Sequence, residues 1–214
     1  MAPLSAFLAW HRAQLARAPF TTNIIQSGTL MACGDVAAQA IERRGARDAA
    51  RDAAPYSASR TLILGSWGGL FNAPFWVIFY RTVNERLPGR IALWVAAAAA
   101  VSPPFNAAFF SYTAALTHAV DEGVREGWGT AAGRARMADK VARKVDDKLW
   151  PTVARSLTLW VPFNTVMFLY IPLALRPLAG SCVGLGWNVY LSIIAAAAPS
   201  VSSAHAPAPS ALPL

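Results

Sequence analysis

Long uncharged stretches alternate with short charged ones along the whole chain. The uncharged windows cover residues 18–34, 61–80, 91–120, 156–175 and 177–214. A helix needs roughly 20 apolar residues to cross the hydrocarbon of a bilayer, and the second, third and fourth windows reach that length directly. The first window reaches it if Asp35 lies inside the membrane and the helix continues to about Ile41. The pattern predicts an all-α integral membrane helical bundle with four spans, at 18–41, 61–80, 91–118 and 156–175.

The last window differs from the others because it begins with Pro177 and contains three glycines. We expect a short fifth helix over 178–197 and leave open whether it crosses the membrane. Residues 1–17 read as an amphipathic helix that ends before Pro19, and residues 198–214 form a Pro/Ala/Ser tail typical of disorder. The membrane domain therefore extends over 18–197.

Two hydrophilic segments separate the predicted spans. Residues 42–59 are expected to form a polar loop, and the charged stretch from Asp121 to Lys148 is expected to form a helix at the surface. Within the third span, the adjacent prolines Pro103 and Pro104 are expected to break or kink the helix near its centre.

Composition agrees with a membrane protein. Hydrophobic residues make up 55% of the chain and charged residues only 14%, with a mean hydropathy of +0.36. Soluble domains usually contain about 25% charged residues. The net charge of +8 does not indicate a nucleic-acid partner, because the basic residues lie in the loops between apolar windows. The two most basic loops, 42–60 and 121–155, are placed on the cytosol-like or matrix-like face by the positive-inside rule.

The residue pattern offers no support for catalysis. The three histidines are scattered, without a nucleophile or a ligand cluster nearby in the sequence, and no Gly-rich phosphate loop is present. We expect no enzyme activity, no metal and no cofactor. Cys33 and Cys182 both lie in apolar segments, where free cysteines are usually buried, so buried thiols are expected.

Polar residues inside the apolar windows are the candidates for function. Asp35 and Gln39 are one helical turn apart and share a face. Asp35 either lines an aqueous path or is neutralised by an arginine, such as Arg60 or Arg176, and holds helices together. Asn164 either faces a cavity or satisfies the backbone freed by Pro162. Arg176, at the end of the fourth span, reads most simply as an interface anchor.

These residues also carry a resemblance to a known family. The chain is similar to the Mpv-seventeen and twenty-two-kilodalton peroxisomal membrane protein family, small multi-span proteins of organelle membranes. The resemblance rests on three blocks. The first contains Trp10, Leu15, Pro19, Thr22, Gly34, Asp35 and Gln39; the second contains Arg60, Thr61, Pro74, Phe79 and Tyr80; the third contains Trp160, Pro162, Asn164, Phe168, Pro172, Arg176, Trp187, Asn188, Tyr190, Leu191 and Ser192.

The chain departs from the family pattern at several polar positions. Alanines 98 and 99 stand where the family has an Asp-Gln pair, Met167 replaces an asparagine, Ala73 replaces a glycine, and Val77 replaces a histidine. If the family's polar residues line a conduit, these changes imply an altered selectivity or a more structural role.

Two functional hypotheses follow. The resemblance implies a weakly selective channel or transporter for small solutes, with Asp35, Gln39, Arg60, Asn164 and Arg176 as its intramembrane polar network. The alternative is a structural or adaptor protein of the same membrane. The expected partners are the lipid bilayer, unidentified small solutes and further copies of the chain. The acid-free N-terminus favours the mitochondrial inner membrane, with peroxisomal and plastid membranes as alternatives.

Overall fold

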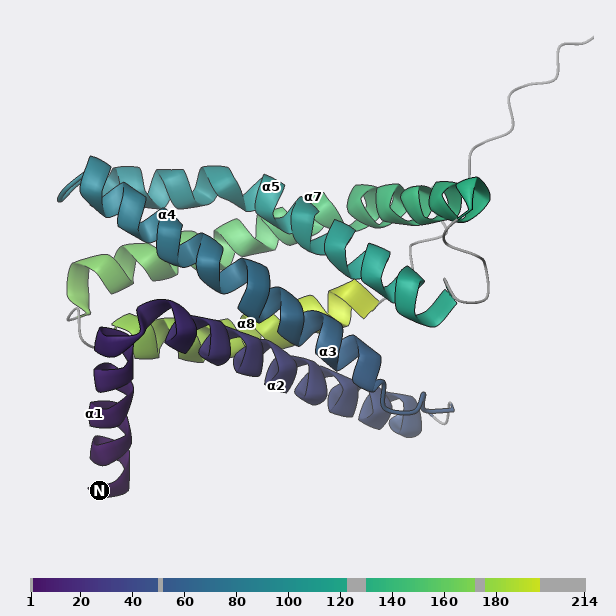
Figure 1. Cartoon of the computed structure of the whole chain (residues 1–214), viewed down its shortest axis with the longest axis horizontal. Coiled ribbons are helices and arrows are strands. Elements are labelled where there is room, and N and C mark those ends of the chain that lie inside the picture. The colour runs from purple at the N-terminus through teal and green to yellow at the C-terminus, as the bar shows by residue number, and fades with distance from the viewer. Residues whose placement is uncertain (1, 50–51, 123–129, 172–175, 197–214) are drawn as a thin grey trace, which may run out of the picture.

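The described residues of the computed structural model form an all-helical bundle (Figure 1). The model describes residues 2–49, 52–122, 130–171 and 176–196 of the 214. The elements are α1 (Ala2–Arg17), α2 (Pro19–Asp48), α3 (Ala58–Trp67), the π-helical turn η1 (Gly68–Asn72), α4 (Ala73–Arg86), α5 (Ile91–Thr117), the π-helical turn η2 (His118–Glu122), α7 (Ala131–Tyr170) and α8 (Arg176–Ala196). The described ranges contain no strand. The predicted all-α class is therefore confirmed for them.

Helix α1 leaves one end of the bundle and points away from it, whereas the other helices extend side by side (Figure 1). Pro19 occupies the first turn of α2, where its missing N–H costs no helical hydrogen bond. Two bonds hold the corner between α1 and α2: His11 Nε2 lies 2.8 Å from Gln26 Oε1, and Thr22 Oγ1 donates to the Gln14 carbonyl at 3.1 Å. The direction of α1 is thus fixed relative to the bundle.

Helices α3 and α4 form one rod through the wide turn η1. The turn lies close to α2, because a Cβ atom added at Gly68 would stand only 2.6 Å from the Ser27 carbonyl oxygen. Pro74 follows in the first turn of α4. A glycine at position 68 is therefore required by the close approach of two backbones.

Helix α5 contains Pro103 and Pro104 but continues through both of them. Its ribbon bends partway along its length in Figure 1. The predicted kink is consistent with this bend, whereas a break in the helix is not observed. Helix α7 likewise continues through Pro151 and Pro162.

One expectation about the hydrophilic segments was wrong. Helix α2 continues to Asp48, so residues 42–48 are helical and not part of a loop, and Glu42 forms an ion pair with Arg60. The expected surface helix is confirmed for residues 131–148, which form the first half of α7 and are continuous with the fourth window. The part of that stretch at 123–129 lies outside the described residues.

The helices pack as two groups. In the first, which we call the α2 group, α2 contacts α3, η1, α4 and α8; in the second, the α5–α7 group, α5 lies along α7. Aromatic contacts join the groups: Trp67 packs against Phe105, Phe109 and Tyr112, with ring centroids 5.4–5.6 Å apart. Further aromatic pairs also cross between the groups, among them Phe75 with Phe105 and Tyr80 with Phe168.

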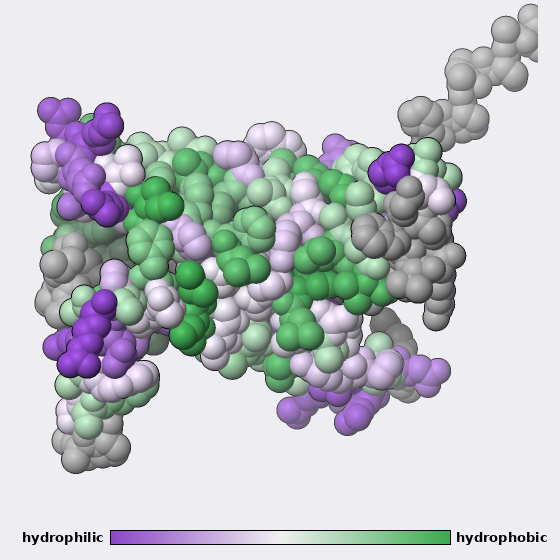
Figure 2. All heavy atoms as spheres, viewed as in Figure 1, coloured by the Kyte–Doolittle hydropathy of each residue, from purple (hydrophilic) through white to green (hydrophobic). Residues whose placement is uncertain are grey.

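Surface hydropathy and helix length fit a membrane protein. The stretches Ala58–Arg86 and Ile91–Val120 are long and apolar enough to cross a bilayer, and Cys182–Ala196 is a shorter apolar helix. Figure 2 shows hydrophobic residues across the middle of the visible face and hydrophilic groups at both ends. Cys33 and Cys182 are exposed, contrary to expectation. The statistics behind that expectation describe proteins in water, whereas hydrocarbon also accommodates an outward-facing thiol.

Candidate functional site

A buried carboxylate on α2 is the centre of the most extensive polar network in the described structure. Asp35 is 0% exposed. Its Oδ1 accepts a hydrogen bond from Ser192 Oγ at 2.5 Å and lies 2.8 Å from Arg60 Nε. Its Oδ2 accepts from Gln39 Nε2 at 2.7 Å and from the hydroxyl of Thr61. Both oxygens are therefore compensated by two groups each, which is close to the capacity of a carboxylate.

Arg60, near the start of α3, joins this carboxylate to a second one. Its Nη1 and Nη2 donate to the two oxygens of Glu42 at 2.7 and 2.9 Å, a bidentate geometry that lysine cannot reproduce. Nη2 also donates to Ser192 Oγ at 2.9 Å. One arginine thus stands between two acids, and the three side chains together carry a formal charge of −1. Arg60 is 21% and Glu42 34% exposed, so the network extends from the sealed Asp35 towards the surface.

Gln39 ties the network to the start of α3. Its Oε1 accepts from the Ser57 backbone N–H at 2.8 Å, and its Nε2 donates to the Ser57 carbonyl at 3.0 Å. Ser57 is also the N-cap of α3, since its hydroxyl accepts from the Arg60 N–H at 3.3 Å. The cap orients the helix turn that carries Arg60 and Thr61.

The third arm of the network comes from α8. Gly34, next to Asp35, packs directly on this helix: a Cβ atom there would lie 2.8 Å from Asn188 Cβ. The absence of a side chain lets α8 approach closely enough for Ser192 to reach both Asp35 and Arg60. Three segments far apart in the sequence thus meet at one carboxylate.

A second set of buried polar groups lies between α5 and α7. Ser102 Oγ donates to Ser156 Oγ at 3.3 Å, and Asn106 Nδ2 donates to the Ser102 carbonyl at 2.8 Å. Thr152 is 0% exposed, and its hydroxyl has no hydrogen-bond partner. Asn164 is 5% exposed on the same helix. Asn164 is therefore buried as a member of α7 and is not one of the groups bonded to Asp35.

The remaining predicted site residues lie in different parts of the structure. Arg176 is the first residue of α8, but its side chain lies outside the description, as does Pro172 entirely. Trp10 is 57% exposed on α1. Trp187 lies between Trp160 and Tyr190, with ring centroids 6.4 and 4.9 Å away.

The other aromatic members of the sequence blocks connect helices. Phe168 of α7 packs against Tyr80 of α4 and Trp94 of α5, at centroid distances of 6.4 and 5.4 Å. Tyr190 receives a hydrogen bond from Arg155 at 2.9 Å. These residues join the two helix groups and do not contact Asp35.

Sequence reasoning missed four members of the network, one of which, Thr61, directly follows the predicted Arg60. Glu42 lies three residues after Gln39 on a helix, so it shares the face of Asp35 and Gln39, but its place in a predicted loop concealed this. Ser57 stands three residues before Arg60, at the spacing of an N-cap. Ser192 is separated from Asp35 by 157 residues, and no local signal indicated its contact.

No metal site emerges from the described residues, among which histidine, cysteine and acidic side chains do not gather in groups of three or more. The arrangement can neutralise charge and hold helices together, and it can present Arg60 and Glu42 to a polar path.

Comparison with known proteins identifies the family. Residues 132–192 match the Mpv17 / PMP22 family. The chain is 31% identical to protein SYM1 of Mycosarcoma maydis over 84% of this chain and 81% of the relative. It is 26% identical to peroxisomal membrane protein 2 of Bos taurus, covering 81% and 82%, and 25% identical to the mitochondrial inner membrane protein Mpv17 of Rattus norvegicus, covering 88% and 97%. Solved structures gave no match. The chain belongs to the Mpv17 / PMP22 family, whose members include membrane proteins of mitochondria and peroxisomes.

Proposed function

We propose that this protein forms a weakly selective conduit for small solutes across an organelle membrane, with the path between the α2 group and the α5–α7 group. The observation that carries the proposal is the set of polar and charged residues buried inside an otherwise apolar bundle. Asp35, Gln39, Asn106 and Asn164 are all at most 6% exposed. Such groups are costly in hydrocarbon and are typical of a substrate or ion pathway.

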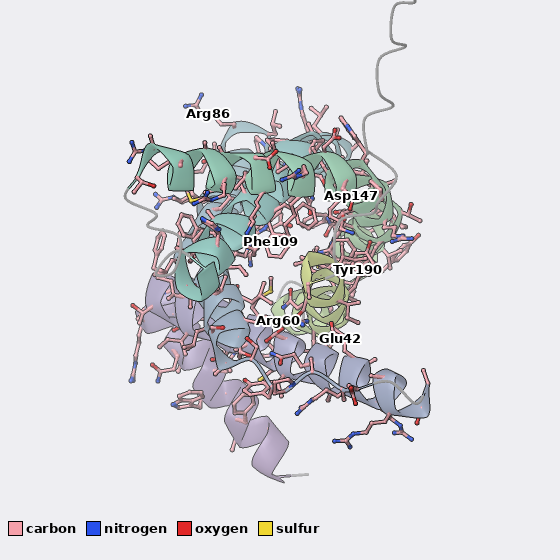
Figure 3. The ribbon with its side chains drawn as sticks, turned by 90° about the vertical axis from the view of Figure 1, so that its right-hand side faces the viewer. Glu42, Arg60, Arg86, Phe109, Asp147 and Tyr190 are labelled. Atoms are coloured by element: carbon pink, nitrogen blue, oxygen red, sulfur yellow. The ribbon has the colours of Figure 1, made fainter. Side chains whose placement is uncertain are left out.

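The network residues have two different roles in this proposal. Asp35 and Gln39 are buried and hydrogen-bonded to other protein groups, so their role is to stabilise the helices that form the wall of the path. Arg60 and Glu42 are partly exposed and supply charge to the path. Figure 3 views the bundle from the end where α7 begins, with Arg60 and Glu42 on the α2 group and Asp147 on the α5–α7 group. Asn164 would line the path farther along α7.

The proposal includes four spans. The rods Ala58–Arg86 and Ile91–Val120 are two of them. Helix α2 and the second half of α7 would be the others, because their polar residues Asp35, Ser156 and Asn164 are buried against neighbouring helices. Helix α8 would be a shorter fifth helix packed on α2.

The membrane and the assembly state are part of the same proposal. The name of the rat relative places that protein in the mitochondrial inner membrane, and the name of the bovine relative places that one in the peroxisome. The acid-free, arginine-containing N-terminus favours the mitochondrial inner membrane for this chain, with peroxisomal and plastid membranes as alternatives. We also propose that copies of the chain associate, since small residues on span surfaces favour helix contacts.

Planar-bilayer recording of the purified full-length protein tests the conduit. Glu42→Gln removes an acid from the proposed wall, so it is expected to shift ion selectivity towards anions while conductance steps persist. Asn164→Leu is expected to reduce the step size. Glu85→Gln is the matched control: it makes the same chemical change at a side chain that is 59% exposed and pairs with Arg81 on the surface. It should behave as wild type.

Silent bilayers from folded wild-type protein would overturn the conduit and favour the structural or adaptor role. That alternative has its own support, because the complete compensation of Asp35 is what a helix-holding ion pair requires. Conductance unchanged in both Glu42→Gln and Asn164→Leu would move the path away from these residues.

A further inference from the structure

The first half of α7 presents a polar side chain at every fourth position. The row consists of Lys140, Lys144, Lys148, Thr152 and Ser156. Residues four apart are neighbours on a helix surface. All five are buried or half-buried, whereas Arg143, one position from Lys144, has a 61% exposed side chain. Three lysines therefore face inward, although the opposite side of the same helix is exposed to solvent.

The lysines of this row differ in how their charges are compensated. Lys140 Nζ lies 3.5 Å from His118 Nδ1, and Lys148 Nζ lies 2.9 Å from an Asp147 oxygen. In the described part of the chain, Lys144 has no acid within ion-pair distance. Its charged neighbours are Lys148 and, from α3 in the opposite group, Arg60. Arg60 is itself occupied by Asp35 and Glu42.

This arrangement disfavours the Lys144 ammonium when nothing is bound to it. Burial, together with repulsion from Lys148 and Arg60, lowers the pKa of Lys144 to about 8. An inward-facing cation without a counter-charge is costly unless another group supplies one.

A second observation lies one turn beyond Lys148. Thr152 is 0% exposed, and its hydroxyl lacks a hydrogen-bond partner in the described structure. Buried hydroxyls are nearly always bonded, so an exception calls for an explanation. An anion held by the neighbouring ammonium groups would supply the acceptor, since a threonine hydroxyl and a lysine ammonium both donate to carboxylate or phosphate oxygens.

We propose that Lys144, Lys148 and Thr152 form a binding site for a small carboxylate or phosphate anion at the end of the bundle where α7 begins. Its role in permeation rests on the proposed conduit, whereas anion binding itself does not. The site would make the conduit favour anionic solutes over cations, because a fixed positive charge raises the local concentration of anions.

Titration of inorganic phosphate tests the site directly. The full-length protein is placed in nanodiscs of zwitterionic lipid, so that no anionic headgroup competes, and heat is measured by calorimetry. Lys144→Gln is expected to weaken phosphate binding by about tenfold or more, as befits a lost charge-assisted bond. Lys144→Arg keeps the charge and should bind within about threefold of wild type.

Arg143→Gln is the matched control, because it removes the same charge from the adjacent, outward-facing position. Its phosphate affinity should stay within about twofold of wild type. Thr152→Val keeps the size of the side chain and should weaken binding without loss of folding. Absence of phosphate binding by wild type, or equal weakening in Lys144→Gln and Arg143→Gln, would overturn the site.

Reversal potentials in planar bilayers separate the two proposals. Lys144→Gln is expected to lower the anion-to-cation permeability ratio, and Arg143→Gln to leave it unchanged. If the protein conducts but Lys144→Gln changes neither its phosphate affinity nor its permeability ratio, the anion site is refuted and the conduit is retained. Silent bilayers combined with a tenfold affinity loss in Lys144→Gln would refute the conduit and retain the anion site.

Discussion

Replacing Asp35 by asparagine should strongly destabilise the fold, although the two side chains have nearly the same shape. The asparagine amide must take the place of one carboxylate oxygen. At the Oδ1 position it would face Arg60 Nε, and at the Oδ2 position it would face Gln39 Nε2. Neither partner can accept a hydrogen bond from it, because both nitrogens only donate. In either orientation the amide of the new side chain therefore faces a nitrogen that can only donate.

The expected cost follows from the burial of the pair. Asp35 is 0% exposed and Arg60 is 21% exposed, so solvent screens this interaction little. Removing one partner of a buried ion pair typically costs about 3–5 kcal/mol, and we expect Asp35→Asn to lie in that range. Ser192 and Thr61 can turn their hydroxyls to accept, which keeps the loss below that of a full truncation.

Equilibrium unfolding in mixed micelles, followed by circular dichroism as the denaturing detergent increases, measures this free energy. Glu85→Gln disrupts an exposed ion pair on α4, so its free energy of unfolding should equal that of wild type. The double variant Asp35→Asn/Arg60→Gln should be more stable than the sum of the single losses predicts, by more than about 1 kcal/mol, because the residues share one interaction. A loss for Asp35→Asn no larger than that for Glu85→Gln would refute the reasoning.

Three further predictions concern packing and charge. Gly34→Ala should destabilise the protein, because its Cβ would lie 2.8 Å from Asn188 Cβ, whereas Gly45→Ala, with nothing within 4 Å, should stabilise α2 slightly; thermal unfolding compares the two. Lys144→Met should raise the thermal midpoint at pH 7, and the gain should shrink between pH 8 and 10.5: a lowered pKa means that the folded state releases its proton first, so wild-type stability rises with pH in that window. A gain independent of pH would contradict this assignment. Trp67→Ala, which removes a ring that packs against Phe105, Phe109 and Tyr112 of the other helix group, should lower the midpoint by more than Gly34→Ala does.

Local patterns were enough to find most helices and three residues of the polar network, Asp35, Gln39 and Arg60. The one-turn spacing of Asp35 and Gln39 placed them on one face, and the structure bonds them to each other at 2.7 Å. Arg60 was named as one of two arginines able to neutralise Asp35, and the structure pairs it with Asp35 at 2.8 Å. A sequence pattern could not choose between Arg60 and Arg176, because that choice depends on which helices pack together.

The parts that sequence patterns missed are those decided by distant contacts. The charged residues that follow Glu42 predict a loop, whereas in the structure α2 continues to Asp48 and Glu42 binds Arg60. Ser192 is an ordinary small residue until α8 packs on Gly34. The row of lysines on α7 lies in the segment for which the sequence predicts a surface helix, and periodicity alone does not show that this helix continues into a buried segment.

The π-helical turn η1 sets the relative rotation of the two halves of one rod. A wide turn contains one residue more than an α-helical turn, so it offsets every side chain after it by about 100°. This offset lets α3 direct Arg60 and Thr61 towards α2 and α8, while the aromatic residue Phe75 on α4 packs against Phe105 of α5. Loss of a single residue within Gly68–Asn72 would convert the rod to a regular helix and swing one half away from its partners. Chain length is therefore as constrained in this short segment as residue identity, and a one-residue deletion there would be harsher than most substitutions.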